Sequence, residues 1–257
     1  MQQRIDVGAH SLPLQVTGEG PTLIWTHGLT SSRRREDLWP LWHLDQITGR
    51  RVVRYDARGH GDAGGPADDP RAYEWPTLAT DLLALADALD APTFVSAGVS
   101  MGTATTLHAA VRSPERIEAM ILTGPPTAWE TREAQADAYR AGAEFVRGKD
   151  PAALVGRVDP PPVFRDRPVE AQIPDVPGEL LPTVLHGAAN SNLPPKEALA
   201  ALDIPTLVLA WADDPGHPVS TAEQLAETIP NAQLHVSPDV DDVRTWTNRM
   251  QGFLDSL

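Results

Sequence analysis

The sequence of 257 residues contains no cysteine. Disulfide bonds, thiolate nucleophiles and cysteine-ligated metals are therefore excluded. Long apolar runs are also missing: no stretch approaches a membrane span, and residues 1–20 hold no run typical of a signal peptide. We therefore expect a cytoplasmic protein that does not act within a membrane.

Lysine is scarce, because Lys149 and Lys196 are the only two and arginine supplies the remaining positive charge. Acidic residues outnumber basic ones, and the formal net charge is −14. Such a surface repels nucleic acid and anionic lipid, so neither is expected as a partner. No phosphate-loop, dinucleotide or zinc-protease pattern appears. We expect a small-molecule substrate without a metal or cofactor, and the oligomeric state stays open.

What the chain does contain is an alternation of short apolar β-rich runs with helical stretches, which is typical of a mostly parallel sheet flanked by helices. An antiparallel hairpin is expected at one sheet edge, from Gln3–Val7 and Leu12–Thr17. The other predicted strands are Thr22–Thr26, Arg51–Tyr55, Thr93–Ala97, Ile117–Thr123, Thr206–Trp211 and Gln233–Val236. The predicted helices are Arg33–Ile47, interrupted by Pro40, and Trp75–Leu89, Met101–Arg112, Ala134–Arg147, Thr221–Thr228 and Asp241–Leu257.

One proline-rich segment, residues 125–196, breaks this rhythm and shows no buried strand. A structureless loop of that length is uncommon in a compact domain. We interpret it as a helical cap inserted after the sixth strand, into a core formed by residues 1–124 and 197–257.

The strongest chemical signal is Gly98-Val99-Ser100-Met101-Gly102, which lies between a predicted strand and a predicted helix. In that context, G-x-S-x-G indicates a nucleophile on a sharp turn, with its hydroxyl exposed above the sheet. The helix start directs free N–H groups at the same place, so the Met101 amide is a candidate donor to an oxyanion. Leu29, after His27-Gly28, is the candidate second donor, and His27 is expected to brace its loop.

These motifs together resemble the α/β-hydrolase superfamily. His27-Gly28 resembles its oxyanion loop, Asp56-Ala57-Arg58-Gly59-His60-Gly61 is similar to its D-x-R-G-x-G segment, and Gly98–Gly102 to its nucleophile elbow. The resemblance implies an eight-stranded sheet and Ser-His-acid hydrolysis of esters, lactones, amides or thioesters. It also implies a triad acid after the penultimate strand, where Asp214 is favoured over its neighbour Asp213.

The sequence departs from the family pattern at the histidine, which the family places after the last strand. Here that loop, Ser237–Asp242, has three aspartates and no histidine. A serine without a base is a poor nucleophile at neutral pH. His217, in Asp213-Asp214-Pro215-Gly216-His217, is the preferred substitute because it follows the predicted acid on the same loop. His60, His186 and Asp242 are further candidates for the base.

Two further features concern the pocket. Arg33-Arg34-Arg35 follows the oxyanion loop and suits either an anionic substrate group or, as we prefer, a solvated helix face. Trp129, at the entrance to the cap, is the tryptophan expected near the substrate.

The sequence therefore predicts a serine hydrolase that cleaves a small or medium, largely apolar ester or lactone through an acyl-enzyme on Ser100. Because the usual histidine is missing, the alternative is a hydrolase-fold protein that binds a ligand or acts as a lyase or cyclase.

Overall fold

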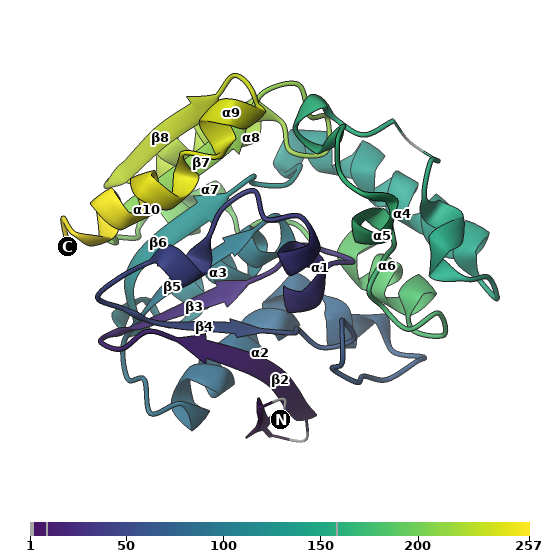
Figure 1. Cartoon of the computed structure of the whole chain (residues 1–257), viewed down its shortest axis with the longest axis horizontal. Helices are drawn as coiled ribbons and strands as arrows, with labels where there is room; N and C mark the ends of the chain where they lie inside the picture. Colours follow the sequence, from purple (N-terminus) through teal and green to yellow (C-terminus); the bar gives the residue numbers. More distant parts are fainter. Residues whose placement is uncertain (1–2, 9, 158) are drawn as a thin grey trace.

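Eight strands form one mixed sheet in the order β1-β2-β4-β3-β5-β6-β7-β8 (Figure 1). The strands are β1 (Gln3–Val7), β2 (His10–Thr17), β3 (Thr22–Thr26), β4 (Arg51–Tyr55), β5 (Phe94–Val99), β6 (Ile117–Thr123), β7 (Thr206–Trp211) and β8 (Ala232–Ser237). β2 is antiparallel to both β1 and β4, and all other neighbours are parallel. The computed structural model describes residues 3–8, 10–157 and 159–257.

The predicted α/β fold and its edge hairpin are confirmed. Five predicted strands, β1, β3, β4, β6 and β7, agree in both bounds, because each is an apolar run between turn residues. β5 runs two residues further than predicted. Gly98 and Val99 belong to it because they pair with Leu122 and Thr123 of β6, a contact that no local pattern reveals.

Helices cover both faces of the sheet. α2 (Trp75–Ala88), α3 (Met101–Arg112) and α8 (Val219–Thr228) share one apolar core with side chains such as Ile24 and Val53. α10 (Trp246–Leu254) packs with the opposite face, where Leu23 and Trp25 point. The alternation along β3 places successive side chains in different cores. No helix in the described part of the chain is long and apolar enough to cross a membrane.

Two predicted helices are wrong in extent. The first ends at Leu38, as α1 (Arg33–Leu38), and a separate 3-10 turn follows at Leu44–Gln46. Pro40 explains the break, since its ring cannot continue a helix. The C-terminal helix divides into α9 (Val240–Val243), which the Asp239 side chain caps, and α10.

The segment 125–196 is helical in its described residues and lies at one end of the sheet (Figure 1). It carries α4 (Arg132–Val146), α5 (Val169–Gln172) and α6 (Leu181–Ala189), and α7 (Lys196–Ala200) follows. α4 and α6 pack together around buried Val146 and Leu181, which form a third apolar cluster with Tyr73. We propose that this segment, called the cap segment below, is the predicted cap.

The turn between β5 and α3 lies directly against the end of β3. A Cβ added to Gly98 would lie 2.6 Å from the carbonyl oxygen of Thr26, and one added to Gly102 would overlap the same oxygen. This oxygen is a backbone atom and cannot rotate away. The two glycines of the G-x-S-x-G motif are therefore required by the close approach of two backbone segments.

We predict that Gly102→Ala lowers the free energy of unfolding by about 2–3 kcal/mol, because the added methyl group forces α3 and β3 apart. The matched control is Gly252→Ala in α10, where nothing lies within 4 Å of the added atom. That variant gains up to about 1 kcal/mol, since alanine favours a helix more than glycine. Urea denaturation measures both, and equal stability of the two variants would contradict the close-packing argument.

Candidate active site

Ser100 occupies the turn between β5 and α3 with strained dihedral angles, φ 56° and ψ −108°. Its amide donates to the Thr123 carbonyl at 3.0 Å, and the Thr123 hydroxyl donates to the Gly98 carbonyl at 2.9 Å. The Thr103 hydroxyl also reaches Gly98. A left-handed serine costs energy, and these buried bonds hold it in place.

Asp214 and His217 begin and end a single turn after β7. The His217 amide donates to the Asp214 carbonyl at 3.1 Å, and the Gly216 amide donates to the Asp214 carboxylate at 2.9 Å. The sequence Asp-Pro-Gly-His suits such a turn, because Asp, Pro and Gly are favoured there. This turn places the two side chains on the same side of the loop, facing Ser100.

The three side chains form one hydrogen-bonded chain. His217 Nδ1 lies 2.8 Å from Asp214 Oδ2, and His217 Nε2 lies 2.9 Å from Ser100 Oγ. A carboxylate only accepts, so Nδ1 carries the hydrogen and Nε2 is left to accept the serine hydroxyl. Among the described histidines, only His217 makes a hydrogen bond to Ser100.

Trp211, the last residue of β7, fixes both members of this turn. Its indole Nε1 donates to Asp214 Oδ2 at 2.8 Å, and its ring packs against His217 with centroids 5.2 Å apart. Burial would raise the pKa of Asp214, but the hydrogen bonds from His217, Trp211 and Gly216 outweigh it and lower that pKa. Asp214 is therefore ionised at neutral pH. Its neighbour Asp213 is exposed, and the carboxylate that His217 meets is that of Asp214.

The loop after β8, where the resemblance places the histidine, is occupied by a different network. Asp242 accepts from the Ser237 hydroxyl at 2.7 Å and lies 2.6 Å from His235 Nε2. Elsewhere, His60 is buried with Nδ1 2.9 Å from the Arg58 carbonyl, and His186 pairs with Glu144 at 3.4 Å. None of these side chains forms a hydrogen bond with Ser100, so His60, His186 and Asp242 are not the base that this arrangement provides.

His27 braces the loop of residues 27–32, called the oxyanion loop below. Its Nε2 accepts from the Ala57 amide at 3.0 Å, so Nδ1 carries the hydrogen and donates to the Gly28 carbonyl at 2.8 Å. A Cβ on Gly28 would lie 3.7 Å from Ser100 Cβ, which places the loop beside the elbow. The amide of Met101, the first residue of α3, has no acceptor within its own helix.

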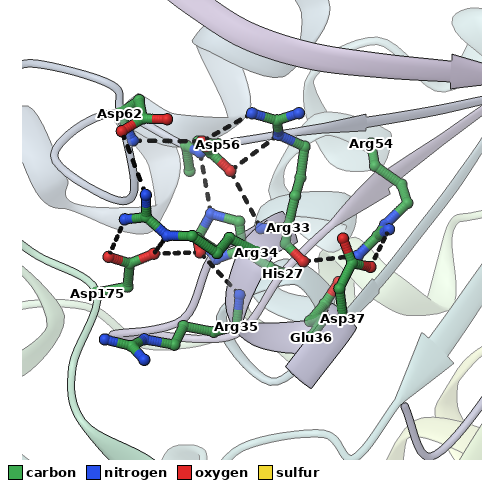
Figure 2. Close-up of polar contacts among 12 residues, drawn as sticks. His27, Arg33, Arg34, Arg35, Glu36, Asp37, Arg54, Asp56, Asp62 and Asp175 are labelled. Atoms are coloured by element: carbon green, nitrogen blue, oxygen red, sulfur yellow. Dashed lines mark hydrogen bonds and ion pairs between the residues drawn. The ribbon is translucent and has the colours of Figure 1, made fainter. Parts of the chain in front are cut away.

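Acidic partners anchor the oxyanion loop and α1 (Figure 2). Buried Asp56 accepts from Arg33 twice through the side chain, at 3.0 and 3.1 Å, and once through the backbone amide. Burial would raise the pKa of Asp56, but the hydrogen bonds from Arg33 outweigh it and lower that pKa. Our preference for a solvated arginine face is wrong for Arg33, whose partly buried guanidinium is paired with Asp56.

Asp175 connects the cap segment to the same loop. Its backbone amide donates to the Thr30 carbonyl at 2.8 Å and its carbonyl accepts from Gly61 at 2.7 Å. Its carboxylate accepts from the Ser32 hydroxyl and from Arg34, at 2.5 and 2.6 Å (Figure 2). The cap segment is thus held against the oxyanion loop by both backbone and charge.

A cavity of about 500 Å³ opens above Ser100 and His217. Apolar side chains on its walls come from the region after α1, from β7 and from the cap segment, and charged side chains line the same space. The apolar group includes Trp39, Leu41, Trp42, Phe164 and Trp211, and the charged group is Arg35, Glu36, Asp37, Asp45, Arg54 and Arg167. In the described chain no cluster of three or more His, Asp or Glu side chains is arranged to hold a metal ion.

Trp129 lies outside the lining of this cavity. Its indole donates to the Pro194 carbonyl at 3.1 Å, and its ring faces the Lys196 ammonium. Sequence reasoning missed Trp39 and Trp42 as cavity residues. The signal was their position directly after the oxyanion loop and α1, where Pro40 forces the chain away from a helix.

Comparisons with known proteins agree with this fold. A sequence profile of the family described as alpha/beta hydrolase fold matches residues 21–243. The chain is similar to 3-oxoadipate enol-lactonase 2 of Acinetobacter baylyi, with 33% identity over 198 residues, 72% of this chain and 69% of that one.

Solved structures share the whole fold. A thermophilic esterase from Thermogutta terrifontis, with malate bound, superposes with a TM-score of 0.79 and 25% identity, covering 100% of this chain and 98% of that one. The enol-lactonase from Burkholderia xenovorans gives a TM-score of 0.75 at 21% identity, covering 98% and 100%, and supports the fold alone.

We predict that Asp56→Asn lowers the free energy of unfolding at pH 7 by about 3 kcal/mol, because Arg33 keeps a buried charge without its partner. The folded-state pKa of Asp56 is lowered, so its contribution is present above the unfolded pKa near 3.9 and is lost as the pH falls through the lower folded value. Urea titrations should show that the difference in free energy of unfolding between Asp56→Asn and wild type is smaller at pH 3 than at pH 7.

The matched control is Asp69→Asn, which removes an equally bidentate but exposed partner of Arg71. Its free energy of unfolding should stay close to that of wild type at both pH values. A loss for Asp56→Asn that is the same at both pH values would show that charge pairing is not its cause.

Proposed function

Because the chain belongs to the α/β-hydrolase fold family, we propose that it is a serine hydrolase that cleaves a small carboxylic ester or lactone through an acyl-enzyme on Ser100. The observation that carries the proposal is the hydrogen-bonded chain from Ser100 Oγ through His217 to Asp214, with distances of 2.9 and 2.8 Å. A hydroxyl, a neutral imidazole and a carboxylate in that order form an activated nucleophile.

In the first half-reaction, Ser100 Oγ attacks the carbonyl carbon while His217 Nε2 takes the hydroxyl proton. The negative charge moves to the carbonyl oxygen, where the amides of Leu29 and Met101 are the proposed donors. Each such donor is typically worth about 3 kcal/mol of barrier. The tetrahedral intermediate then expels the alcohol oxygen, which takes the proton from His217, and an acyl-serine ester remains. With a lactone the alcohol stays attached to the acyl chain.

In the second half-reaction, His217 takes a proton from water as the water oxygen attacks the acyl-serine. Collapse of this intermediate breaks the bond to Ser100 Oγ, which recovers its proton from His217, and the carboxylic acid leaves. Asp214 stays ionised throughout and stabilises the imidazolium that forms twice in each turnover.

The names of the relatives support an ester or lactone substrate, since they include enol-lactonases and an esterase. The cavity volume of about 500 Å³ suits a small molecule. The histidine-free loop Ser237–Asp242 is the reason to consider a binding protein or a lyase instead. We infer instead that His217, which lies 2.9 Å from Ser100 Oγ on another loop, serves as the base, and this favours the hydrolase.

We predict that a fluorophosphonate probe labels the native protein and that Ser100→Ala abolishes the labelling. His217→Ala should lower the labelling rate and kcat by about a thousandfold or more, because no other described base contacts Ser100. His186→Ala, in the cap segment, is the control and should leave both within about threefold. Undiminished labelling in His217→Ala would disprove the assignment of the base.

Asp213 and Asp214 are adjacent, so substituting each in turn gives a second matched pair of variants. Asp214→Asn should lower kcat by about a hundredfold to ten-thousandfold, since an amide holds the wrong imidazole tautomer and does not stabilise the imidazolium. Asp213→Asn should have little effect, because that side chain is exposed. Ester hydrolysis followed in a pH-stat measures both, and a larger loss in Asp213→Asn would reverse the assignment.

A further inference from the structure

Arginines around the cavity fall into two groups. Arg33, Arg34 and Arg54 each reach a carboxylate within 3.0 Å, in Asp56, Asp175 and Asp37 respectively. Arg35 and Arg167 line the cavity, as Arg54 does, but neither forms an ion pair with any described residue. The unpaired arginines are thus the two whose charge is left for a ligand.

Arg35 comes from α1, on the core side of the cavity. In Figure 2 no contact is drawn from its guanidinium to Asp56 or Asp175, which its neighbours Arg33 and Arg34 occupy. One terminal nitrogen of Arg35 donates to the carbonyl of Glu170, which fixes the side chain. Its Nε is buried and has no hydrogen-bond partner in the described chain. The second terminal nitrogen makes no hydrogen bond to a described residue either and is not buried, so it is the group that can reach a ligand in the cavity.

Arg167 lies in the cap segment, between Phe164 and α5. Its guanidinium lies 5.7 Å from the Phe164 ring centroid and makes no hydrogen bond to a described residue. Burial and the charge of Arg35 lower the pKa of Arg167, although Glu36 partly opposes them. Arg35 bonds to the carbonyl of Glu170, three residues after Arg167, so the two arginines come from adjoining segments and line the same cavity.

Carboxylates in the lining do not neutralise this pair. Glu36 and Asp37 form ion pairs with Arg54, and Glu36 also accepts from the Trp25 indole at 3.1 Å. Asp45 lies exposed on the turn Leu44–Gln46. A planar carboxylate from a ligand would satisfy both guanidiniums at once, because arginine matches its two oxygens.

We propose that Arg35 and Arg167 form a carboxylate subsite within the cavity of Ser100, so that the substrate is an ester or lactone with a second, free carboxylate group. This inference rests on the proposed function, since Ser100 supplies the reacting end of the same cavity. It changes the expectation of a largely apolar substrate. The tryptophans contact the middle of the substrate, and the arginines bind its charged end.

A substrate held in this way also connects the two parts of the protein. One guanidinium belongs to α1 and the other to the cap segment, which Asp175 already joins to the oxyanion loop. A bound carboxylate accepts hydrogen bonds from both guanidiniums and so holds α1 and the cap segment together.

The test uses the monoethyl esters of succinic, glutaric and adipic acids, each against the same ester with its free carboxylate replaced by a carboxamide. The three lengths measure the spacing between Ser100 and the subsite. Wild type should prefer the best carboxylate ester by about tenfold or more in kcat/KM. Arg35→Gln and Arg167→Gln should each remove about tenfold to a hundredfold of kcat/KM for that ester, mainly through KM, and leave the carboxamide ester within about threefold.

Arg165→Gln is the matched control, because Arg165 is exposed on the same stretch and does not line the cavity; it should change neither substrate. Equal kcat/KM for carboxylate and carboxamide esters, or equal losses on both in the arginine variants, would overturn the subsite and leave the hydrolase proposal intact.

Failure of the proposed function has a different signature, which is no turnover of any ester and no fluorophosphonate labelling. The subsite is then judged by binding alone, with the same ester pairs titrated into Ser100→Ala. Tryptophan fluorescence is the readout, since Trp39, Trp42 and Trp211 line the cavity. Tighter binding of the carboxylate member, lost in Arg35→Gln and Arg167→Gln, supports the subsite, and equal binding overturns it.

Discussion

Contact between the β5–α3 turn and the Thr26 carbonyl is the constraint that positions every other part of the site. Because Gly98 and Gly102 have no side chains, the strained turn of Ser100 fits against the end of β3. The chain that leaves β3 then passes beside Ser100 as the oxyanion loop. The amides of Leu29 and Met101, the two proposed oxyanion donors, thereby come from segments that meet at this one turn.

Asp214 and His217, the proposed acid and base, share one four-residue turn, so a single loop conformation sets both of their positions. Trp211 reinforces it by donating to Asp214 and packing against His217. The loop after β8 supplies neither of these two side chains. Its polar groups instead bind one another, with the Trp246 indole donating to Ser237 and Ser237 to Asp242, which fastens α9 and α10 to the sheet.

Arginine has two distinct roles around this site. Where a guanidinium meets a buried carboxylate, as in Arg33 with Asp56, the charges cancel and hold the backbone of the oxyanion loop. Where the carboxylates are already taken, a guanidinium remains available to the cavity. The formal net charge of −14 describes the whole chain. It does not reveal that two arginines without an acidic partner line a cavity inside the protein.

Local patterns in the chain were enough to establish the sheet, the elbow and the order of the family motifs, because apolar periodicity and glycine-rich turns are properties of short segments. The family resemblance ranked Asp214 first as the acid, and His217 was preferred as the base because it follows Asp214 on the same loop. Folding was needed to show that His217 reaches Ser100, 117 positions earlier in the chain, across the ends of β5, β6 and β7. Folding also selected which arginines are neutralised and which tryptophans face the cavity. Those outcomes depend on partners such as Asp175, which lies 141 positions from Arg34 in the chain, and no local pattern encodes such a pairing.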